Sequence, residues 1–433
     1  KIQFASSWQK SRKAWDFKGN GEKSGIYKSV DSGNTWNLIS TQKSGFPTGN
    51  GVGRIGLAVF DSKTLYAVVD NQFRRPKSKA STEKTDLSKN YFESISKERF
   101  LKIDDLKLDK FLTTNSFPKK YNSTKIKELV KNDLIKPSDL KLYLEDANTV
   151  MFETPIIGAQ VYRSDDGGLN WTLKNSYYLD RLYNTYGYYF GKIHVSPVNK
   201  DNIYIYGVPF IKSNDGGVTY KSIDYPNVHV DHHDLWINPK NPKHLINGND
   251  GGVNISYDDG ENWLKLNQPS VGQFYTINVD NEIPYNVYGG LQDNGVWMAS
   301  SKSKESLRWH QTGQNNWKSI MGGDGMQVQI DNRDSNIIYT GSQFGVYYRI
   351  NKSKRTYIKP KHELGESPLR FNWQTPILLS SHNQDVVYFA GQYVFRSMNQ
   401  GKNWEKISTD LTNGKAEGNV PFGTITSIAE SKF

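Results

Sequence analysis

The chain has 433 residues, no cysteine and a formal net charge of +11. The lack of thiols excludes a disulfide scaffold, a cysteine nucleophile and cysteine-ligated zinc or iron–sulfur sites. Hydrophobic residues make up 36% and aromatic residues 13% of the chain, which is enough for a sizeable core. No apolar run approaches the roughly 20 residues of a membrane span. We therefore expect no membrane-spanning segment, and at most association with a membrane through a larger complex.

The positive charge is unevenly distributed. Residues 71–150 contain 18 Lys and Arg against 12 Asp and Glu, so this segment carries a surplus of 6 out of the total of 11. The sequence has no nucleic-acid-binding motif and no interleaving of aromatic and basic residues of the kind that stacks on bases. We expect no nucleic-acid partner.

One eight-residue pattern, Ser-x-Asp-x-Gly-x-x-Trp, recurs along the chain. Its copies contain Asp31, Asp166, Asp215 and Asp258, and a fifth copy has Asn399 in place of the aspartate. Ser and Asp side chains accept hydrogen bonds from nearby backbone N–H groups, and Gly permits a positive φ. The pattern predicts a tight hairpin turn whose final Trp packs between sheets. We assign these five positions a structural role.

Short runs of β-branched and aromatic residues recur at the same positions relative to this pattern. Residues 192–195 and 203–206 are one such pair of runs, and each pair is followed by a Gly-containing turn and a third run. Four strands in each 40–50 residues are typical of a β-propeller blade. The sequence therefore predicts an all-β propeller of four-stranded blades. Six complete blades are expected at residues 54–171, 172–220, 221–263, 264–317, 318–350 and 351–404.

The two ends of the chain fit only parts of blades. Residues 1–36 match the second half of a blade, and residues 423–428 match a strand that opens another. Open sheet edges are a liability, so a propeller must close. Either the two ends pair with each other or the chain belongs to a longer protein, and we favour the second.

Residues 72–153 interrupt the β pattern. Apolar residues follow helical i, i+3, i+4 spacing in three places, namely Leu108, Phe111 and Leu112; Ile126, Leu129 and Val130; and Leu140, Tyr143 and Leu144. We predict a propeller at residues 1–71, a small α-helical insertion at 72–153, and a continued propeller at 154–433 with its last blade truncated. The insertion either seals a blade edge or forms a docking surface or lid.

At this point the sequence resembles a known group. The recurring pattern is similar to the Asp-box, or BNR, repeat of sialidases, sortilin-type receptors and two-propeller xyloglucan-active glycoside hydrolases. The stretches at 231–242 and 248–253, and 5–9 leading to 25–29, resemble exported bacterial proteins labelled sortilin N-terminal domain or BNR-repeat glycosyl hydrolase. The resemblance implies an extracytoplasmic location, secreted, periplasmic or at the cell surface. It is a resemblance of fold, and fold alone does not assign a function.

Propeller ligands bind at the mouth of the central funnel, beside the starts of the innermost strands. Aligning the repeats places seven ligand-binding candidates there: Tyr189, His232, His233, Asp234, Phe274, Asp324 and Trp373. Aromatic rings with carboxylates and amides suit stacking on sugars and hydrogen bonding to hydroxyl groups. They equally suit a peptide segment.

The mouth also contains a possible metal-binding run and a possible pair of catalytic carboxyl groups. Neighbouring residues of a strand point to opposite faces, so the run from Asp231 to Asp234 cannot converge on one ion, and we expect no metal and no cofactor. Asp250, Asp293 and Asp324 come from successive blades, and a pair of them could act as acid and base in glycoside hydrolysis. Each lies within two residues of a Gly, however, so a turn explains all three, and they are weak catalytic candidates.

The sequence thus favours a non-catalytic scaffold that binds a protein or peptide segment at the bacterial cell envelope. The alternative is a glycoside hydrolase or glycan-binding propeller that acts on a polysaccharide. A third possibility is a rigid module without a ligand, which only spaces other domains. A hydrolase requires two carboxyl groups about 5–10 Å apart in an open cleft lined by aromatic residues.

Overall fold

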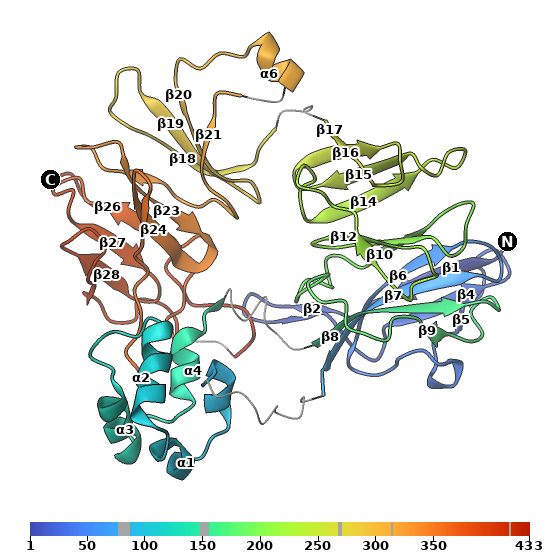
Figure 1. The fold of residues 1–433 in the computed structure, drawn as a ribbon, viewed down its shortest axis with the longest axis horizontal. Helices are drawn as coiled ribbons and strands as arrows, with labels where there is room; N and C mark the ends of the chain where they lie inside the picture. The colour runs from blue at the N-terminus through green and yellow to red at the C-terminus, as the bar shows by residue number, and fades with distance from the viewer. Residues whose placement is uncertain (77–86, 148–155, 267–270, 313–314, 415–416) are drawn as a thin grey trace. The chain divides into compact units, whose positions relative to one another are not determined.

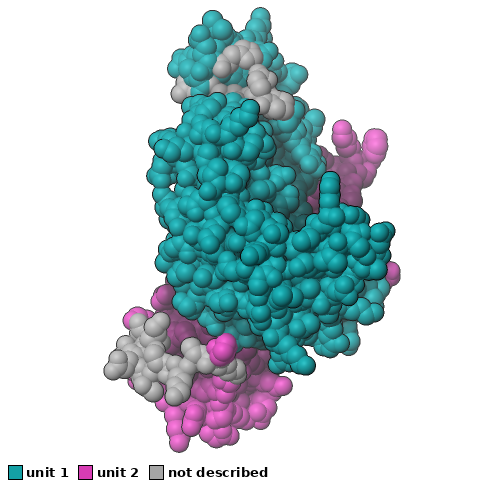
Figure 2. Space-filling model, turned by 90° about the vertical axis from the view of Figure 1, so that its right-hand side faces the viewer, with its two compact units in different colours: residues 1–75, 151–328, 416–420 teal, residues 76–150, 329–415, 421–433 magenta. Residues whose placement is uncertain are grey.

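The computed structural model describes residues 1–76, 87–147, 156–266, 271–312, 315–414 and 417–433. The described residues form antiparallel sheets, six of which have four strands (Figure 1). The chain divides into two compact units, coloured separately in Figure 2. Unit 1 comprises residues 1–75, 151–328 and 416–420, and unit 2 comprises residues 76–150, 329–415 and 421–433.

Unit 1 contains four four-stranded sheets in chain order. They are β6 (Val52–Val59), β7 (Leu65–Arg74), β8 (Ile156–Ser164) and β9 (Thr172–Leu173); β10 (Lys192–Val195), β11 (Ile203–Tyr206), β12 (Phe210–Ser213) and β13 (Lys221–Ser222); β14 (His232–Ile237), β15 (Leu245–Asn249), β16 (Gly252–Ser256) and β17 (Leu264–Lys265); and β18 (Phe274–Val279), β19 (Asn286–Leu291), β20 (Gly295–Ser300) and β21 (Lys318–Met321). Within each sheet, every strand pairs with the next one along the chain. This connectivity is that of a propeller blade, and it confirms the predicted fold class.

Unit 1 begins with an incomplete sheet, as the repeats predict. It has three strands, β1 (Gln3–Ser7), β4 (Gly25–Ser29) and β5 (Asn37–Leu38), with the hairpin β2 (Ser11–Arg12) and β3 (Phe17–Lys18) between the first two. A 3-10 turn, η1 (Gln42–Ser44), leads into the first complete blade. The short helix α6 (Leu307–Thr312), which the sequence pattern did not predict, lies between β20 and β21.

Unit 2 contains two further four-stranded blades and the helical insertion. The strands are β22 (Gln329–Ile330), β23 (Ile337–Ser342), β24 (Val346–Asn351) and β25 (Lys354–Tyr357), with the 3-10 turn η3 (Gln343–Gly345), followed by β26 (Ile377–Leu379), β27 (Val387–Ala390), β28 (Val394–Ser397) and β29 (Glu405–Lys406). Residues 423–428 were expected to form a strand, and this prediction is wrong. They are not paired to a strand; instead the backbone N–H of Ile425 donates to the carbonyl of Gly391 at 2.8 Å.

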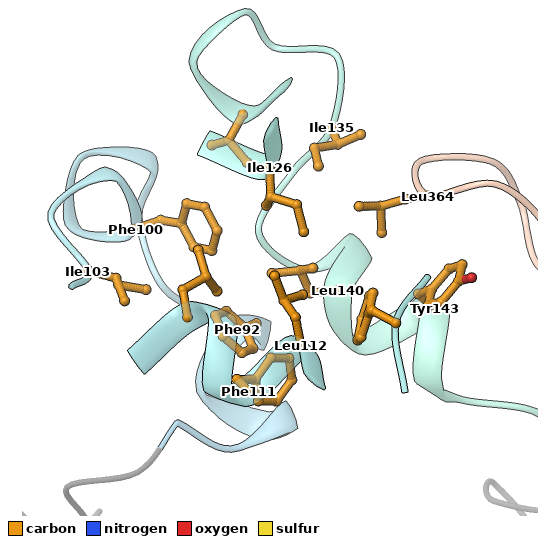
Figure 3. Close-up of a cluster of buried hydrophobic side chains, with 13 residues drawn as sticks. Phe92, Phe100, Ile103, Phe111, Leu112, Ile126, Ile135, Leu140, Tyr143 and Leu364 are labelled. Carbon is orange, nitrogen blue, oxygen red and sulfur yellow. The ribbon is translucent and has the colours of Figure 1, made fainter. Parts of the chain in front are cut away.

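The helical insertion forms a small apolar core of its own. Its elements are η2 (Lys89–Glu93), α1 (Lys97–Leu101), α2 (Asp105–Thr114), α3 (Ser123–Lys131) and α4 (Asp139–Leu144). The three helices expected from spacing are α2, α3 and α4, and their apolar stripes face one cluster, which Figure 3 shows. Leu364, from the connection between β25 and β26, is buried in that cluster. The insertion therefore packs against a blade connection of unit 2.

The recurring turns join the third and fourth strands of their blades, and their hydrogen bonds repeat almost identically. In every copy the Gly N–H donates to the Ser hydroxyl oxygen at 2.8 Å. The Asp or Asn oxygen accepts from the backbone N–H four residues further on at 2.9 Å. Gly217, for example, has a φ of 94°, a conformation that residues with a Cβ rarely adopt.

The copies end in Trp, except that the copy containing Asp215 ends in Tyr220, and this aromatic residue is buried to different degrees. Trp263 is 5% exposed, packs against Phe210, and donates its Nε1–H to the carbonyl of Ile223 at 2.7 Å. Trp36, in the incomplete first sheet, is 41% exposed. The same turn thus contributes a large apolar contact only where a neighbouring sheet covers it.

Candidate functional site

The two ends of each blade carry different kinds of side chain. In an antiparallel four-stranded sheet, the start of the first strand and the turn between the second and third strands lie at one end, and the recurring turns lie at the other. Asp231 and Asp324 precede first strands, whereas Asp250 and Asp293 lie in turns between second and third strands. All four residues belong to unit 1. Asp231 and Asp250 come from the blade β14–β17, Asp293 comes from the blade β18–β21, and Asp324 lies in the segment that follows β21.

These four aspartates form what we call the mouth carboxylate cluster. The side chains of Asp250 and Asp293 are hydrogen-bonded to each other, and so are those of Asp293 and Asp324. Asp324 also accepts a hydrogen bond from the backbone N–H of Asp293 at 3.1 Å and from the Tyr275 hydroxyl at 3.4 Å. The three candidate acids from successive loops are thus in direct contact rather than separated by a cleft.

Burial and mutual repulsion disfavour negative charge in this cluster. Burial, followed by the charges of Asp324 and Asp250, raises the pKa of Asp293 to about 7. Burial and the nearby Asp250 raise the pKa of Asp231 to about 6, and burial raises the pKa of Asp324. Neighbouring carboxyl groups do not ionise independently, so Asp231, Asp293 and Asp324 keep their protons to a higher pH than an ordinary aspartate does.

A histidine and two aromatic rings border the cluster. His233 Nε2 is paired with Asp250. The His233 ring lies 5.5 Å from the ring of Tyr189 in an edge-on arrangement and 6.3 Å from the stacked ring of Phe190. Tyr189 is 56% exposed, so it offers an aromatic face to solvent beside the acids.

Three other predicted ligand-binding residues have contacts of their own. His232 is buried, with Nδ1 hydrogen-bonded to Asn247 at 2.8 Å and its ring against Phe210, and burial lowers its pKa. Phe274 lies 6.2 Å from the ring of Trp317. Trp373 belongs to unit 2, where its ring meets that of Phe344 edge-on at 5.2 Å.

Asp234 lies on another surface of the same strand. The register of β14 against β15 shifts between His232 and Asp234. Because of this irregularity, the two side chains do not point to the same face of the sheet. Asp234 lines a cavity of about 690 Å³ bounded by the first strands β6, β10 and β14 and by Ser6 and Trp8. Burial opposes ionisation of Asp234, but the Leu235 N–H at 2.9 Å and the charge of Lys192 lower its pKa.

Sequence reasoning missed three members of the site. Asp231 was considered as part of the polar run Asp231–Asp234 at the mouth and not as a single acid, and Tyr275 was aligned to the mouth beside Phe274 but was not among the chosen candidates. His229, whose Nε2 lies 3.2 Å from the carbonyl oxygen of Asp293, precedes the strand and was not considered. The register of β18 against β19 shifts between Phe274 and Thr276, so strand alternation alone does not give the direction of Tyr275.

The recurring-turn aspartates are bound locally. Hydrogen bonds from Thr35 and Ser29 lower the pKa of Asp31 to about 2. Burial slightly opposes the effect at Asp215, where hydrogen bonds from Thr219 and Ser213 lower the pKa to about 2. Each of these carboxylates already has its donors within the turn.

In the part of the chain that the structure describes, no group of three or more His, Asp or Glu side chains is arranged to hold a metal ion. Over the same residues, no helix has the length and apolar character of a membrane span.

Comparisons with known proteins do not assign a family. No family model matches the sequence, and no curated protein matches it. Among solved structures, a GH74 enzyme from Niastella koreensis is 10% identical, with a TM-score of 0.30, over 91% of this chain and 64% of its own. YCF48 bound to a D1 peptide is 8% identical, with a TM-score of 0.30, over 92% of this chain and 97% of its own.

A GH74 xyloglucanase from Xanthomonas campestris is 12% identical, with a TM-score of 0.20, over 93% of this chain and 62% of its own. The chain therefore spans less than two thirds of the length of either GH74 enzyme. Whole-chain similarities this weak transfer no residue role. The chain's own four-stranded meanders establish the propeller-blade architecture.

Proposed function

We propose that this chain is a non-catalytic propeller that binds a basic peptide or protein segment at the mouth carboxylate cluster. The observation that carries the proposal is the direct hydrogen bonding of Asp250, Asp293 and Asp324. A glycosidase needs its two carboxyl groups about 5–10 Å apart, so that the sugar and, in inverting enzymes, a water fit between them. The pairs Asp250–Asp293 and Asp293–Asp324, which are in contact, leave no such space.

The same cluster suits a positively charged partner. Burial, and then the negative charges of Asp324 and Asp250, raise the pKa of Asp293, so each added charge makes further ionisation in the cluster more costly. A Lys or Arg side chain placed there would relieve that repulsion and form charge-assisted hydrogen bonds. The exposed ring of Tyr189 beside His233 offers a face for cation–π contact or for an apolar neighbour of the basic residue.

We propose an extracytoplasmic location at a bacterial cell envelope, in which the protein reaches the membrane only through a complex. This rests on the resemblance of the repeats and of the 231–253 region to exported bacterial proteins. The absence of cysteine is compatible with that location.

Fluorescence anisotropy with labelled peptides of equal length tests the proposal. One peptide carries Lys and Arg, one carries Glu, and one is neutral. Because the chain has a net charge of +11, non-specific attraction would favour the acidic peptide, so selective binding of the basic peptide is informative. We expect Asp324→Asn to weaken basic-peptide binding by about tenfold, equivalent to 1.4 kcal/mol.

The matched control is Asp258→Asn, at the opposite end of its blade, which should leave binding unchanged. Preference for the acidic peptide, or an equal effect of both substitutions, would overturn the proposal.

A second candidate is a glycoside hydrolase, and one observation favours it. With a pKa of about 7, Asp293 is protonated in about half of the molecules at neutral pH, so a proton is available there for general acid catalysis. The test is release of reducing ends from a panel of polysaccharides including xyloglucan, by wild type and by Asp293→Asn. Release that depends on Asp293 would establish hydrolysis and replace the binding proposal.

A further inference from the structure

A buried carboxyl group lies near the mouth but outside the carboxylate cluster. Asp70, on β7, has no exposed surface. Its two carboxyl oxygens each accept a hydrogen bond from the Gln72 side-chain amide at 2.8 Å. A single neutral donor is poor compensation for a buried charge, which normally requires a paired cation.

Two glycines make the carboxyl inaccessible to water. A Cβ at Gly187 would lie 2.1 Å from Asp70 Cγ, and a Cβ at Gly53 would lie 2.9 Å from its Oδ2. Gly53 comes from β6, at a register irregularity against β7. Gly187 comes from the connection between β9 and β10, residues 182–191, which we call the covering loop. The loop can approach this closely only because residue 187 has no side chain.

The covering loop also carries the aromatic edge of the candidate site. It contains Tyr189 and Phe190, whose rings contact His233. Arg54 on β6 holds the loop, donating from Nη1 to the carbonyl of Tyr189 at 2.6 Å and to that of Tyr188 at 3.2 Å. A change in the position of the loop would therefore move the aromatic edge of the mouth.

The groups that face Asp70 come from three elements. The covering loop contributes the buried phenol of Tyr183, and burial together with the charge of Asp70 raises the pKa of that phenol. β6 contributes Gly53, which lies against Asp70, and the guanidinium of the next residue, Arg54, donates hydrogen bonds to the loop carbonyls. From its own strand Asp70 has the amide of Gln72, and the residue paired with it on β8 is Ala159.

We propose that Asp70 is a proton-dependent switch: the covering loop closes over the neutral carboxyl and is released when the carboxyl ionises and requires water. Burial raises the pKa of Asp70 to about 7. By linkage, the neutral carboxyl stabilises the closed loop fully below the ordinary aspartate range, and this contribution falls as the pH rises until it is lost just above about pH 7. The same rise in pH makes the mouth carboxylate cluster more negative. A basic segment would then reach the mouth more easily and be attracted to the cluster more strongly at the same pH. This consequence rests on the proposed function.

Hydrogen exchange of the covering-loop amides, without ligand, tests the switch itself. Protection factors are corrected for intrinsic exchange and compared at about pH 6 and about pH 8, one unit on either side of the titration. In wild type we expect protection of residues 182–191 to fall by roughly tenfold over this range. In Asp70→Asn, which keeps a hydrogen bond to Gln72 without a titrating group, protection should be independent of pH.

Asp61→Asn is the control, because Asp61 is an exposed turn carboxylate in the same sheet whose pKa is lowered by the Thr64 and Lys63 N–H groups. It should retain the wild-type fall. Equal pH dependence in wild type and Asp70→Asn, or none in wild type, would overturn the proposal.

If Asp70→Asn does not fold, Gly187→Ala provides the second test. Its Cβ would occupy the position of the carboxyl, so the loop should be unprotected at both pH values, and normal protection would contradict the switch. Peptide binding measured separately distinguishes the two proposals. A pH-dependent loop in a protein that binds no basic peptide refutes the proposed function but leaves the switch intact.

Discussion

The two ends of a blade use the same amino acid in opposite ways. At the recurring turns, Asp166, Asp215 and Asp258 are surrounded by N–H and hydroxyl donors, and their pKa values are lowered. At the mouth, Asp293 and Asp324 face other carboxyl groups, and their pKa values are raised. A carboxylate with all its donors stabilises the fold, whereas a carboxyl group held against others gains from a positively charged neighbour. This contrast distinguishes structural acids from the acids that we propose to bind a ligand.

The largest effect should come from the turn end, where the aromatic anchor rather than the acid carries most of the energy. Trp263→Ala removes a ring that is 5% exposed and its hydrogen bond to Ile223, so we expect a loss of about 3–5 kcal/mol in unfolding free energy. Chemical denaturation measures the loss. Trp36→Ala is the matched control, because the same position is 41% exposed there, and it should cost much less. Equal costs would show that burial does not decide the contribution of the Trp.

At the mouth, removing a carboxylate should stabilise the protein. Asp293→Asn takes away a group whose raised pKa makes the folded state less stable as the pH rises from about 4 to about 7. At pH 8 we expect the unfolding free energy of the variant to exceed that of wild type by about 1–2 kcal/mol. This is less than 1.4 kcal/mol multiplied by the whole pKa shift, because solvent screens a half-buried group. The two proteins should converge in stability below about pH 4, where the wild-type carboxyl is neutral. A variant less stable than wild type at pH 8 would contradict the assignment.

At the turn end, removing a carboxylate should have the opposite sign. Asp166→Ala removes the acceptor for the N–H groups of Leu169 and Asn170, so we expect a loss of about 1 kcal/mol. Denaturation at neutral pH measures the loss. Because the turn lies at the far end of its blade, any binding activity should persist at a temperature where the variant is folded. Loss of activity in a folded variant would mean that the turn carboxylates are not purely structural.

The smallest effect should be that of pH on the turn carboxylates near neutrality. Their lowered pKa values mean that their stabilising contribution is present above the ordinary aspartate range and is lost only as the pH falls below it. Asp258→Asn should therefore show the same pH dependence of stability as wild type between about pH 6 and 8. If the substitution changed the pH dependence of stability in that range, the carboxylates at the turn end would not differ from those at the mouth in the way that we propose.

Repetition made most of the architecture predictable. The recurring turn fixes where the third strand ends and the fourth begins, so each complete copy located a hairpin in the chain. The helices α2, α3 and α4 were predictable because their apolar residues keep a helical period. The tail at 423–428 has the alternation of a strand but no strand pairs with it, and a strand depends on a partner that sequence does not specify.

The candidate site was only partly predictable, because contact between loops of different blades depends on tertiary structure. Alignment of the repeats placed Asp250, Asp293 and Asp324 at one end, but it could not show that they touch. His232 and His233 were grouped by adjacency, although one is a core residue and the other binds Asp250. Asp70 gave a signal that was overlooked: an acidic residue directly after the buried run 65–69 of an apolar strand.

Titration of individual aspartate carboxyl carbons by nuclear magnetic resonance tests the central contrast most directly. The account predicts that Asp293 titrates near pH 7, whereas Asp258 titrates below its ordinary value of 3.8. Assignment by Asp293→Asn and Asp258→Asn identifies the two signals. If both carboxyl groups titrated together near pH 4, the mouth acids would not be held against one another, and the proposed binding site would lose its physical basis.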